Sequence, residues 1–123
     1  MKTLSTSKAP AALGPYSQGL STGNMTFVSG QLPVNPENGD IPETIEEQTA
    51  QSLSNIRNIL AESKMTMANV IKTTVFLSDL DDFTRMNEIY GTFFEDPYPT
   101  RCCVQVAAIP KGCKVEIECI AIK

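Results

Sequence analysis

Apolar residues recur at helical spacing in two segments of the chain. Between residues 45 and 62 they recur on one face at helical spacing (Ile45, Leu53, Ile56 and Leu60), and the capping-box pattern at residues 44–47 marks the start of a helix. A second segment opens at Asp81 or Asp82 and is ended by the proline that follows Asp96. The pattern therefore predicts two amphipathic helices. The buried stripe expected of the second is Phe83, Met86, Tyr90, Phe93 and Phe94.

Runs of β-branched and apolar residues alternate with these helical segments and predict extended strands. The clearest runs are 25–30, 70–78, 101–106 and 114–122, and a further strand pair is expected near the N-terminus. Pro110-Lys-Gly112 lies between the last two runs, which predicts a C-terminal hairpin. Ile71, Val75 and Leu77 are expected on the apolar side of their strand. The order predicts an α+β fold with two helices on one face of a mostly antiparallel sheet.

Length and charge narrow the classes of function. The 123 residues suit one domain over 1–123, and 41% apolar with 20% charged residues is a globular composition. No apolar run approaches the roughly 20 residues that cross a bilayer, and the first residues lack the apolar core of a signal peptide. A formal net charge of -4 without a basic stripe disfavours nucleic acid as a partner. We therefore expect a cytoplasmic protein that binds neither membranes nor nucleic acid.

Histidine is absent, and the four cysteines lie near the C-terminus: Cys102, Cys103, Cys113 and Cys119. The chain thus lacks the commonest metal ligand and the usual general base, and no C-x-x-C pair offers a zinc site. We expect no metal, and reduced thiols that are mostly small buried apolar side chains.

The alternation of side chains along the last two predicted strands separates core from candidate chemistry. The last strand has an apolar face and a mixed face, the latter formed by Glu116, Glu118, Ile120 and Ile122. On the preceding strand we expect one set under the helices (Cys102, Val104, Val106) and the other opposite (Arg101, Cys103, Gln105). A second face that is half apolar needs a partner. We therefore expect this second face to pack against other subunits, with Arg101 and Glu118 at the subunit interface.

Residue spacing alone leaves a plainer interpretation open. An Arg and a Glu on neighbouring strands more often form an ordinary cross-strand ion pair than a catalytic set. The remaining candidates also have structural interpretations. Tyr16 can be a packed loop aromatic and Ser29 a turn hydroxyl, while Asn87 can be a helix-surface amide and Cys103 a half-buried thiol. The residues by themselves predict an oligomeric α+β domain with an anion site at its subunit interface.

Seven motifs occur in order along the chain: G-P-Y-S-Q at 14–18, V-S-G-Q at 28–31, Q-T-x-Q-x-L-x-N-I at 48–56, K-T-T-V-F-L at 72–77, M-N-x-x-Y at 86–90, P-T-R-C-C-V at 99–104 and I-P-K-G-x-x-V-E-I-E at 109–118. They resemble the motifs of the Rid family, also called the YjgF family of reactive intermediate deaminases. Each is weak alone, but the ordered set covers nearly the whole chain. The resemblance implies a chorismate-mutase-like fold and a homotrimer with three sites between subunits.

The resemblance also implies an activity and a set of site residues. Archetypal imine deaminases of the family keep the Arg matched by Arg101, and their acidic residue is matched by Glu118. Pocket positions are matched by Tyr16, Ser29, Gly30, Asn87 and Cys103. The implied reaction, with no cofactor and no metal, is hydrolysis of a 2-imino acid such as 2-iminobutanoate or 2-iminopropanoate. The usual P-A-R is P-T-R here, and Cys102 replaces the usual Ser; neither change touches a matched catalytic position.

In the implied mechanism, Arg101 anchors the substrate carboxylate and Glu118 deprotonates the attacking water. Three other functions remain alternatives. One is a non-catalytic module that senses 2-ketobutyrate or another small carboxylate, because it would also need Arg101. Another is an endoribonuclease or translation inhibitor, against which the negative charge and the missing histidine both argue. A third is a chaperone-like role that depends on apolar surface or oxidised cysteines.

Overall fold

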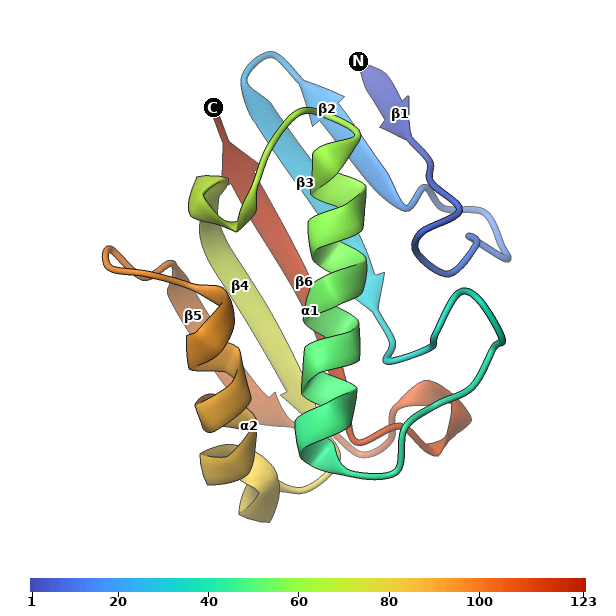
Figure 1. Ribbon diagram of the computed structural model, residues 1–123, viewed down its shortest axis with the longest axis vertical. Helices are drawn as coiled ribbons and strands as arrows, with labels where there is room; N and C mark the ends of the chain where they lie inside the picture. Colours follow the sequence, from blue (N-terminus) through green and yellow to red (C-terminus); the bar gives the residue numbers. More distant parts are fainter.

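One six-stranded sheet with two helices on one of its sides makes up the architecture (Figure 1). The structure is a computed structural model that describes residues 1–123. The strands are β1 (Lys2–Leu4), β2 (Gly19–Thr22), β3 (Met25–Gln31), β4 (Val70–Leu77), β5 (Thr100–Gln105) and β6 (Val115–Ile122). The helices are α1 (Ile45–Ala61) and α2 (Phe83–Tyr90), with single 3-10 turns η1 (Met67–Asn69), η2 (Leu80–Asp82), η3 (Gly91–Phe93) and η4 (Pro110–Gly112). The predicted α+β class is confirmed, and so is an N-terminal strand pair, β1 with β2.

The strands lie in the order β1-β2-β3-β6-β4-β5, and every neighbouring pair is antiparallel except β4 with β5. The predicted C-terminal hairpin is wrong, because β4 lies between β5 and β6 and pairs with both. The position of α2 explains this arrangement. A helix between two strands provides the crossover that brings the second strand back parallel to the first. β6 then enters antiparallel between β3 and β4 and becomes a central strand.

α1 begins where the sequence predicts it because Thr44 caps its first turn. The Thr44 hydroxyl accepts a hydrogen bond from the Glu47 backbone N–H (3.1 Å) and donates one to the Glu47 carboxylate (2.9 Å). These bonds satisfy one of the free backbone donors at the helix start. Leu53, Ile56 and Leu60 on the sheet-facing side of α1 are fully buried. The helix is therefore held by its apolar face against the sheet.

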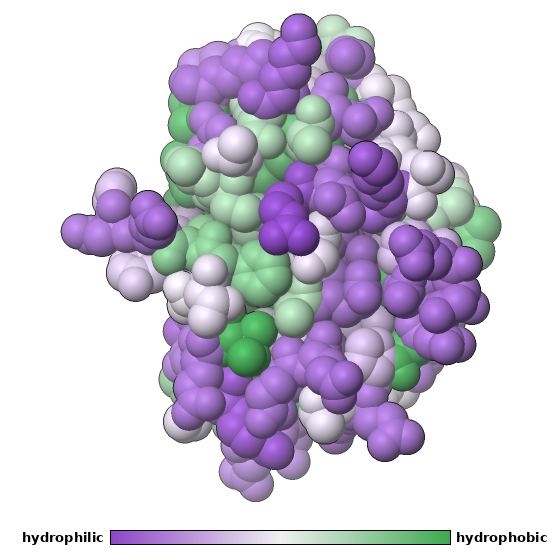
Figure 2. All heavy atoms as spheres, in the orientation of Figure 1, coloured by the Kyte–Doolittle hydropathy of each residue, from purple (hydrophilic) through white to green (hydrophobic).

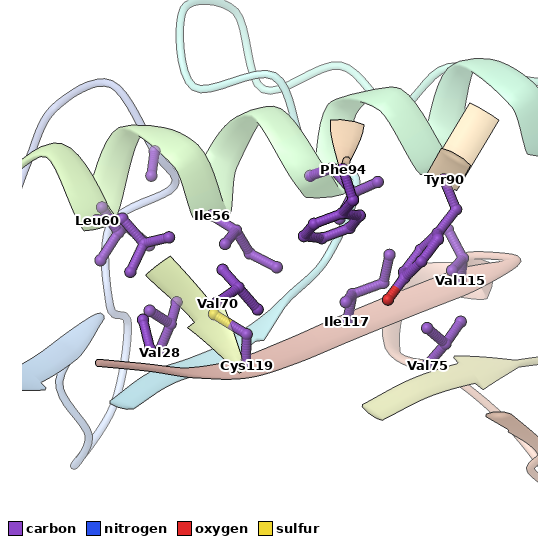
Figure 3. Packing of buried hydrophobic residues seen from close by; sticks show 14 of the residues in the cluster. Val28, Ile56, Leu60, Val70, Val75, Tyr90, Phe94, Val115, Ile117 and Cys119 are labelled. Carbon is purple, nitrogen blue, oxygen red and sulfur yellow. The ribbon is translucent and has the colours of Figure 1, made fainter. Parts of the chain in front are cut away.

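The core fills the space between the helices and the sheet (Figure 3). The predicted core face of β6 is confirmed, since Val115, Ile117, Cys119 and Ala121 are all buried. Cys113 is buried as well, so the prediction of buried thiols holds for two of the four cysteines. All four are free thiols. Burial raises the pKa of Cys119 to about 12, so this thiol stays protonated and acts as a small apolar side chain.

Two residues that the sequence places in the core lie at the surface instead. Ile71 is 42% exposed because a register shift between Val70 and Lys72 moves it out of the regular alternation of β4. Thr73, rather than Ile71, is buried under the helices. Phe83 is 36% exposed at the start of α2, whereas Met86 and Tyr90 on the same helix are buried as predicted, and so is Phe94 beyond it.

The predicted faces of β5 are inverted in the structure. In the parallel register with β4, Arg101 is paired with Thr73 and Cys103 with Val75, and both partners are buried under the helices. Arg101, Cys103 and Gln105 therefore point to the helix side, while Cys102 and Val104 point away from it and are exposed. The sequence misleads here because β5 is an edge strand, where apolar residues need not face the core.

The side of the sheet away from the helices has no covering element in the chain. Phe27 and Val104 are exposed there, with Ile120 and Ile122 half-buried beside them. The half-apolar second face predicted for β6 is thus confirmed, and we call it the open face. The helix side, in contrast, is hydrophilic over most of its surface, with an apolar area left of centre in Figure 2. No helix combines the length and the apolar character needed to cross a membrane.

Candidate functional site

Arg101 is held in place by one face of α2. Its Nη1 donates a hydrogen bond of 2.6 Å to the side-chain oxygen of Asn87. Its Cζ lies 4.8 Å from the centroid of the Tyr90 ring and 5.4 Å from that of Phe83. Residues 83, 87 and 90 share one side of a helix because they are four and three positions apart. A guanidinium held in this way keeps in-plane N–H groups for an anion, and their geometry suits a carboxylate.

The Tyr90 ring is itself fixed from two sides. Its hydroxyl is 2.8 Å from the Thr73 hydroxyl on β4, and its ring lies 4.7 Å from that of Phe94. Figure 3 shows the Tyr90 oxygen directed from α2 toward the sheet. Burial raises the pKa of this hydroxyl, with the bond to Thr73 and the charge of Arg101 acting in the opposite direction. Tyr90 therefore presents a neutral, rigid ring to Arg101.

Cys103 lies two residues after Arg101 on the same side of β5 and packs against the core. Burial raises the pKa of its thiol, although the nearby Arg101 charge partly offsets this effect. A thiol whose pKa is raised is mostly protonated near neutral pH and is a weak nucleophile. The Cys103 thiol therefore lines the candidate site as an uncharged side chain and is not a reactive nucleophile.

The other predicted site residues lie far along the sheet, where β3 and the loop before β2 meet. Ser29 donates a hydrogen bond of 2.5 Å to the Ser17 backbone carbonyl, and its own N–H bonds to the Gln18 carbonyl at 2.9 Å. The buried Gln18 side chain accepts from the Thr6 N–H and donates to the Pro10 carbonyl. These bonds fold the G-P-Y-S-Q loop over β3. Its Tyr16 remains half-exposed, at 54%.

Polar residues of α1 fix the loop that follows β3. The Asn55 side-chain amide donates to the carbonyls of Leu32 (3.1 Å) and Val34 (3.0 Å), and that of Gln48 donates to the Pro42 carbonyl (2.8 Å). Both side chains are buried, so their motif serves the loop rather than chemistry. The loop is thereby held as one wall of a cavity.

Two cavities adjoin Tyr16 and Ser29. The larger, about 700 Å³, is also lined by Gly30, Lys111 and Glu116. The smaller, about 490 Å³, is also lined by Glu118, which is exposed on the open face of β6. A third cavity of about 710 Å³ lies on the helix side, between the end of α1 and the segment after α2, and contains none of the predicted site residues.

The predicted residues thus form two separate groups within one chain. Arg101, Asn87 and Cys103 form a cationic group on the helix side of the β5 edge. Tyr16, Ser29, Gly30 and Glu118 form an acidic group around β3 and β6. The expectation that Arg101 and Glu118 share one face is wrong, because Glu118 points to the open face while Arg101 points to the helix side. Neither group is a complete site for a substrate that needs both charges.

Sequence reasoning misses three residues of these groups. The apolar pattern assigns Phe83 and Tyr90 to the core alone, although their spacing with Asn87 is the signal that they share a helix face with it. Strand alternation places Glu116 on the same face as Glu118 but not among the site residues. Strand alternation is the only signal in the sequence for Glu116, and it does not show which of the two carboxylates takes part in the chemistry.

The fold is that of an α+β protein, and Arg101 with its partners on α2 is its candidate site for a carboxylate. The family model described as Endoribonuclease L-PSP matches residues 6–123. The chain belongs to this family, and the resemblance to Rid (YjgF) proteins seen in the sequence is confirmed.

Relatives of known name cover the whole chain. An Escherichia coli K12 protein named 2-iminobutanoate/2-iminopropanoate deaminase is 46% identical over 99% of this chain and 98% of its own length. The crystal structure of E. coli TdcF with bound serine has a TM-score of 0.96 at 46% identity, covering 100% of this chain and 99% of that one. RidA from an Antarctic Psychrobacter species gives a TM-score of 0.97 at 42% identity, with 100% of both chains covered.

Proposed function

We propose that this protein is an enzyme that hydrolyses reactive 2-imino acids, such as 2-iminobutanoate and 2-iminopropanoate, to 2-keto acids and ammonia. The observation that carries the proposal is the Arg101 guanidinium, which Asn87 and two aromatic rings hold while other N–H groups remain for a carboxylate. The name of the E. coli relative supports the reaction. The serine bound to TdcF supports a small amino-acid-like ligand.

The proposed assembly is a homotrimer with its sites between subunits. Two features support it: the charged groups of the site lie on opposite sides of one sheet, and the open face is partly apolar. In this arrangement Arg101 of one subunit meets the acidic group of the next. Analytical ultracentrifugation tests the assembly, and the expected mass is three times the chain mass of 13.4 kDa. A monomer at micromolar concentration would contradict it.

In the proposed mechanism Arg101 binds the substrate carboxylate and orients the imine carbon. Glu118 positions a water molecule and takes its proton as the oxygen attacks that carbon. Tyr16 closes the apolar side of the pocket, and Ser29 with the Gly30 backbone shapes the remainder. The Cys103 thiol, whose pKa is raised by burial, is a bystander, and its backbone N–H helps to hold the carboxylate. The scheme uses no cofactor and no metal, because an iminium carbon is already electrophilic.

The proposed role in the cell follows from the reactivity of the substrate. Pyridoxal-phosphate enzymes that act on threonine or serine release enamines that become 2-imino acids. Removing these compounds in the cytoplasm protects such enzymes from covalent damage. The role requires only a small soluble substrate and no macromolecular partner.

A trapping experiment tests the activity directly. A threonine dehydratase generates 2-iminobutanoate in the presence of semicarbazide, and the semicarbazone is followed by absorbance. The protein is expected to suppress the semicarbazone signal in proportion to its concentration. An unchanged signal at high protein concentration would exclude turnover of this imine.

The second candidate function is carboxylate sensing without turnover. The observation in its favour is that the Arg101 group alone suffices to bind a carboxylate. Saturable binding of 2-ketobutyrate by calorimetry, together with an unchanged semicarbazone signal, would select this function. Endoribonuclease activity, which the family description names, is disfavoured by the net charge of -4.

Substitution of Tyr90 is expected to weaken the site through Arg101. Tyr90→Leu removes a ring that lies 4.8 Å from the guanidinium carbon, and such a contact contributes about 1 kcal/mol. The expected result is a decrease of about five-fold in kcat/KM, mainly through KM. Tyr90→Phe keeps the ring, loses only the hydrogen bond to Thr73, and is expected to keep kcat/KM near the wild-type value. Steady-state kinetics of both variants check this prediction; equal losses would show that the hydrogen bond to Thr73, and not the ring beside Arg101, supports the site.

A further inference from the structure

Glu116 is a second carboxylate next to Glu118 on β6. The two residues are two positions apart and therefore point to the same side of the strand. In the register with β4 they lie opposite Phe76 and Thr74. They differ in environment, since Glu116 is half-buried and Glu118 is exposed. Tyr16 and Ser29 line two cavities; Glu116 lines the larger of them and Glu118 the smaller.

The side chain of Glu116 packs against the bare backbone of Gly30. A Cβ atom at Gly30 would lie 2.9 Å from Oε1 of Glu116, closer than real Cβ contacts, and 3.1 Å from its carboxyl carbon, which is tighter than most of them. Glycine at position 30 therefore leaves the space that the carboxylate occupies. This contact joins the V-S-G-Q segment to the acidic strand and fixes Glu116 at the wall of the larger cavity.

The carboxylate of Glu116 has no partner within the chain. The ion pair in the structure joins Arg85 to Asp82, on α2 and the turn before it. Lys111 lines the same cavity of about 700 Å³ but forms no ion pair with Glu116. Partial burial without an ion-pair partner disfavours the charged form of this carboxyl group. The group is also free to exchange a proton with a molecule in the cavity.

The surroundings of Glu116 favour its protonated form. Burial raises the pKa of this carboxyl group, and the neighbouring Glu118 raises it further. The other titratable groups around it are Lys111 and Tyr16 in the same cavity and Cys113, whose own pKa Glu116 helps to raise. Two neighbouring carboxyl groups with unequal environments are the usual arrangement of an acid beside a base.

Hydrolysis of an imine requires two proton transfers at different atoms. The attacking water must lose a proton, and the nitrogen must gain one before it can leave as ammonia. We propose that Glu116 is a second catalytic carboxyl group, which protonates the departing nitrogen while Glu118 deprotonates the water. This inference rests on the proposed deaminase activity and adds a residue to it.

The proton balance of the proposed step closes without a further reactant. Water adds to the iminium carbon, and its proton passes to the Glu118 carboxylate. Glu116 then gives its proton to the amino nitrogen of the tetrahedral intermediate. The C–N bond breaks with its electron pair on ammonia, and the hydroxyl proton returns to Glu116 as the carbonyl forms. Glu118 finally releases its proton to solvent, where ammonia takes it up as ammonium.

Kinetics of Glu116→Gln over a range of pH test the proposal. Glu116 must be protonated to act, so wild-type kcat is expected to fall as the pH rises through its raised pKa. Glu116→Gln is expected to lower kcat about 10²-fold and to lose this alkaline decrease. Glu116→Asp keeps a carboxyl group and is expected to restore part of the rate and the decrease. Glu88→Gln, an exposed carboxylate of α2, is the matched control and should behave as wild type.

Stability measurements separate this role from a structural one. Because the fold raises the pKa of Glu116, the charged form disfavours folding, and this cost is present above the raised pKa and absent at low pH. Glu116→Gln is therefore expected to increase the free energy of unfolding at neutral pH, with no gain in acid. A variant that is more stable but about 10²-fold slower supports the proposal.

The outcomes distinguish this inference from the function on which it rests. An active wild type with a Glu116→Gln variant of the same rate and pH profile overturns the role of Glu116 and leaves Glu118 to carry both protons. An equal loss of rate at every pH, with reduced stability, also overturns it. An inactive wild type overturns the deaminase proposal and this inference together.

Discussion

Arg101→Ala is expected to lower kcat/KM for 2-iminobutanoate by about 10²- to 10³-fold. The variant loses two charge-assisted hydrogen bonds to the substrate carboxylate, each worth about 1.5–2 kcal/mol at an exposed side chain. A total of about 3–4 kcal/mol corresponds to the expected decrease. The semicarbazone assay measures it, and the signal with this variant should match that of the uncatalysed reaction. The chain should remain folded, because Arg101 is exposed and contributes nothing to the core.

Two other arginine variants make this result specific. Arg101→Lys keeps the charge but loses the planar fork, so it is expected to recover only part of the activity. Arg85→Ala removes an arginine of α2 that pairs with Asp82 and does not line the site, so it should remain fully active. Turnover by Arg101→Ala at the wild-type rate would show that the carboxylate is anchored elsewhere.

Glu118→Gln is expected to slow the chemical step by about 10²-fold or more, because the amide cannot take a proton from water. Binding of 2-ketobutyrate, which lacks the imine, should change by less than about three-fold, since Arg101 still holds its carboxylate. Kinetics at saturating imine and calorimetry with the keto acid measure the two effects separately. Equal rates for wild type and variant would contradict the assignment of Glu118 as the base.

Mixed assemblies of the two variants test whether one site uses two chains. A Glu118→Gln subunit still supplies Arg101, and an Arg101→Ala subunit still supplies Glu118. A site that combines these two intact residues is therefore active in a mixed assembly. Random co-assembly should restore about one quarter of the wild-type sites. Trimers purified through a different tag on each variant contain both chains, and about one third of their sites should be intact. No recovery of activity would place both groups of each site on one chain.

The first helix and the central strand are predictable from the sequence because burial decides them. The end predicted for the second helix is wrong, because α2 stops at Tyr90 and a 3-10 turn follows, well before the proline after Asp96. α1 carries both a strong apolar face and a cap at Thr44, so its start is correct, and β6 alternates cleanly from Val115 to Ala121. For β5 the sequence predicts the wrong faces and the wrong partner. Its exposed side carries Cys102 and Val104, and nothing in a single edge strand shows that a helical crossover makes it parallel to β4.

The candidate site is predictable as a set of residues but not as an arrangement. The motifs identify Arg101 and Glu118, yet the side of the sheet on which each lies depends on the pairing of β4 with both of its neighbours. The contact of Glu116 with Gly30 is invisible in the sequence for the same reason, since the two residues are distant along the chain and meet only where β3 lies beside β6.

The separation of Arg101 from Glu118 has a consequence for gene expression. If two chains supply one site, as in the proposed assembly, a newly made chain would be idle until it finds its partners. The activity per molecule would then rise with the amount of protein. At low expression, the total activity would then fall more steeply than the amount of protein. Control of synthesis would act on both the number of chains and the fraction of them that work.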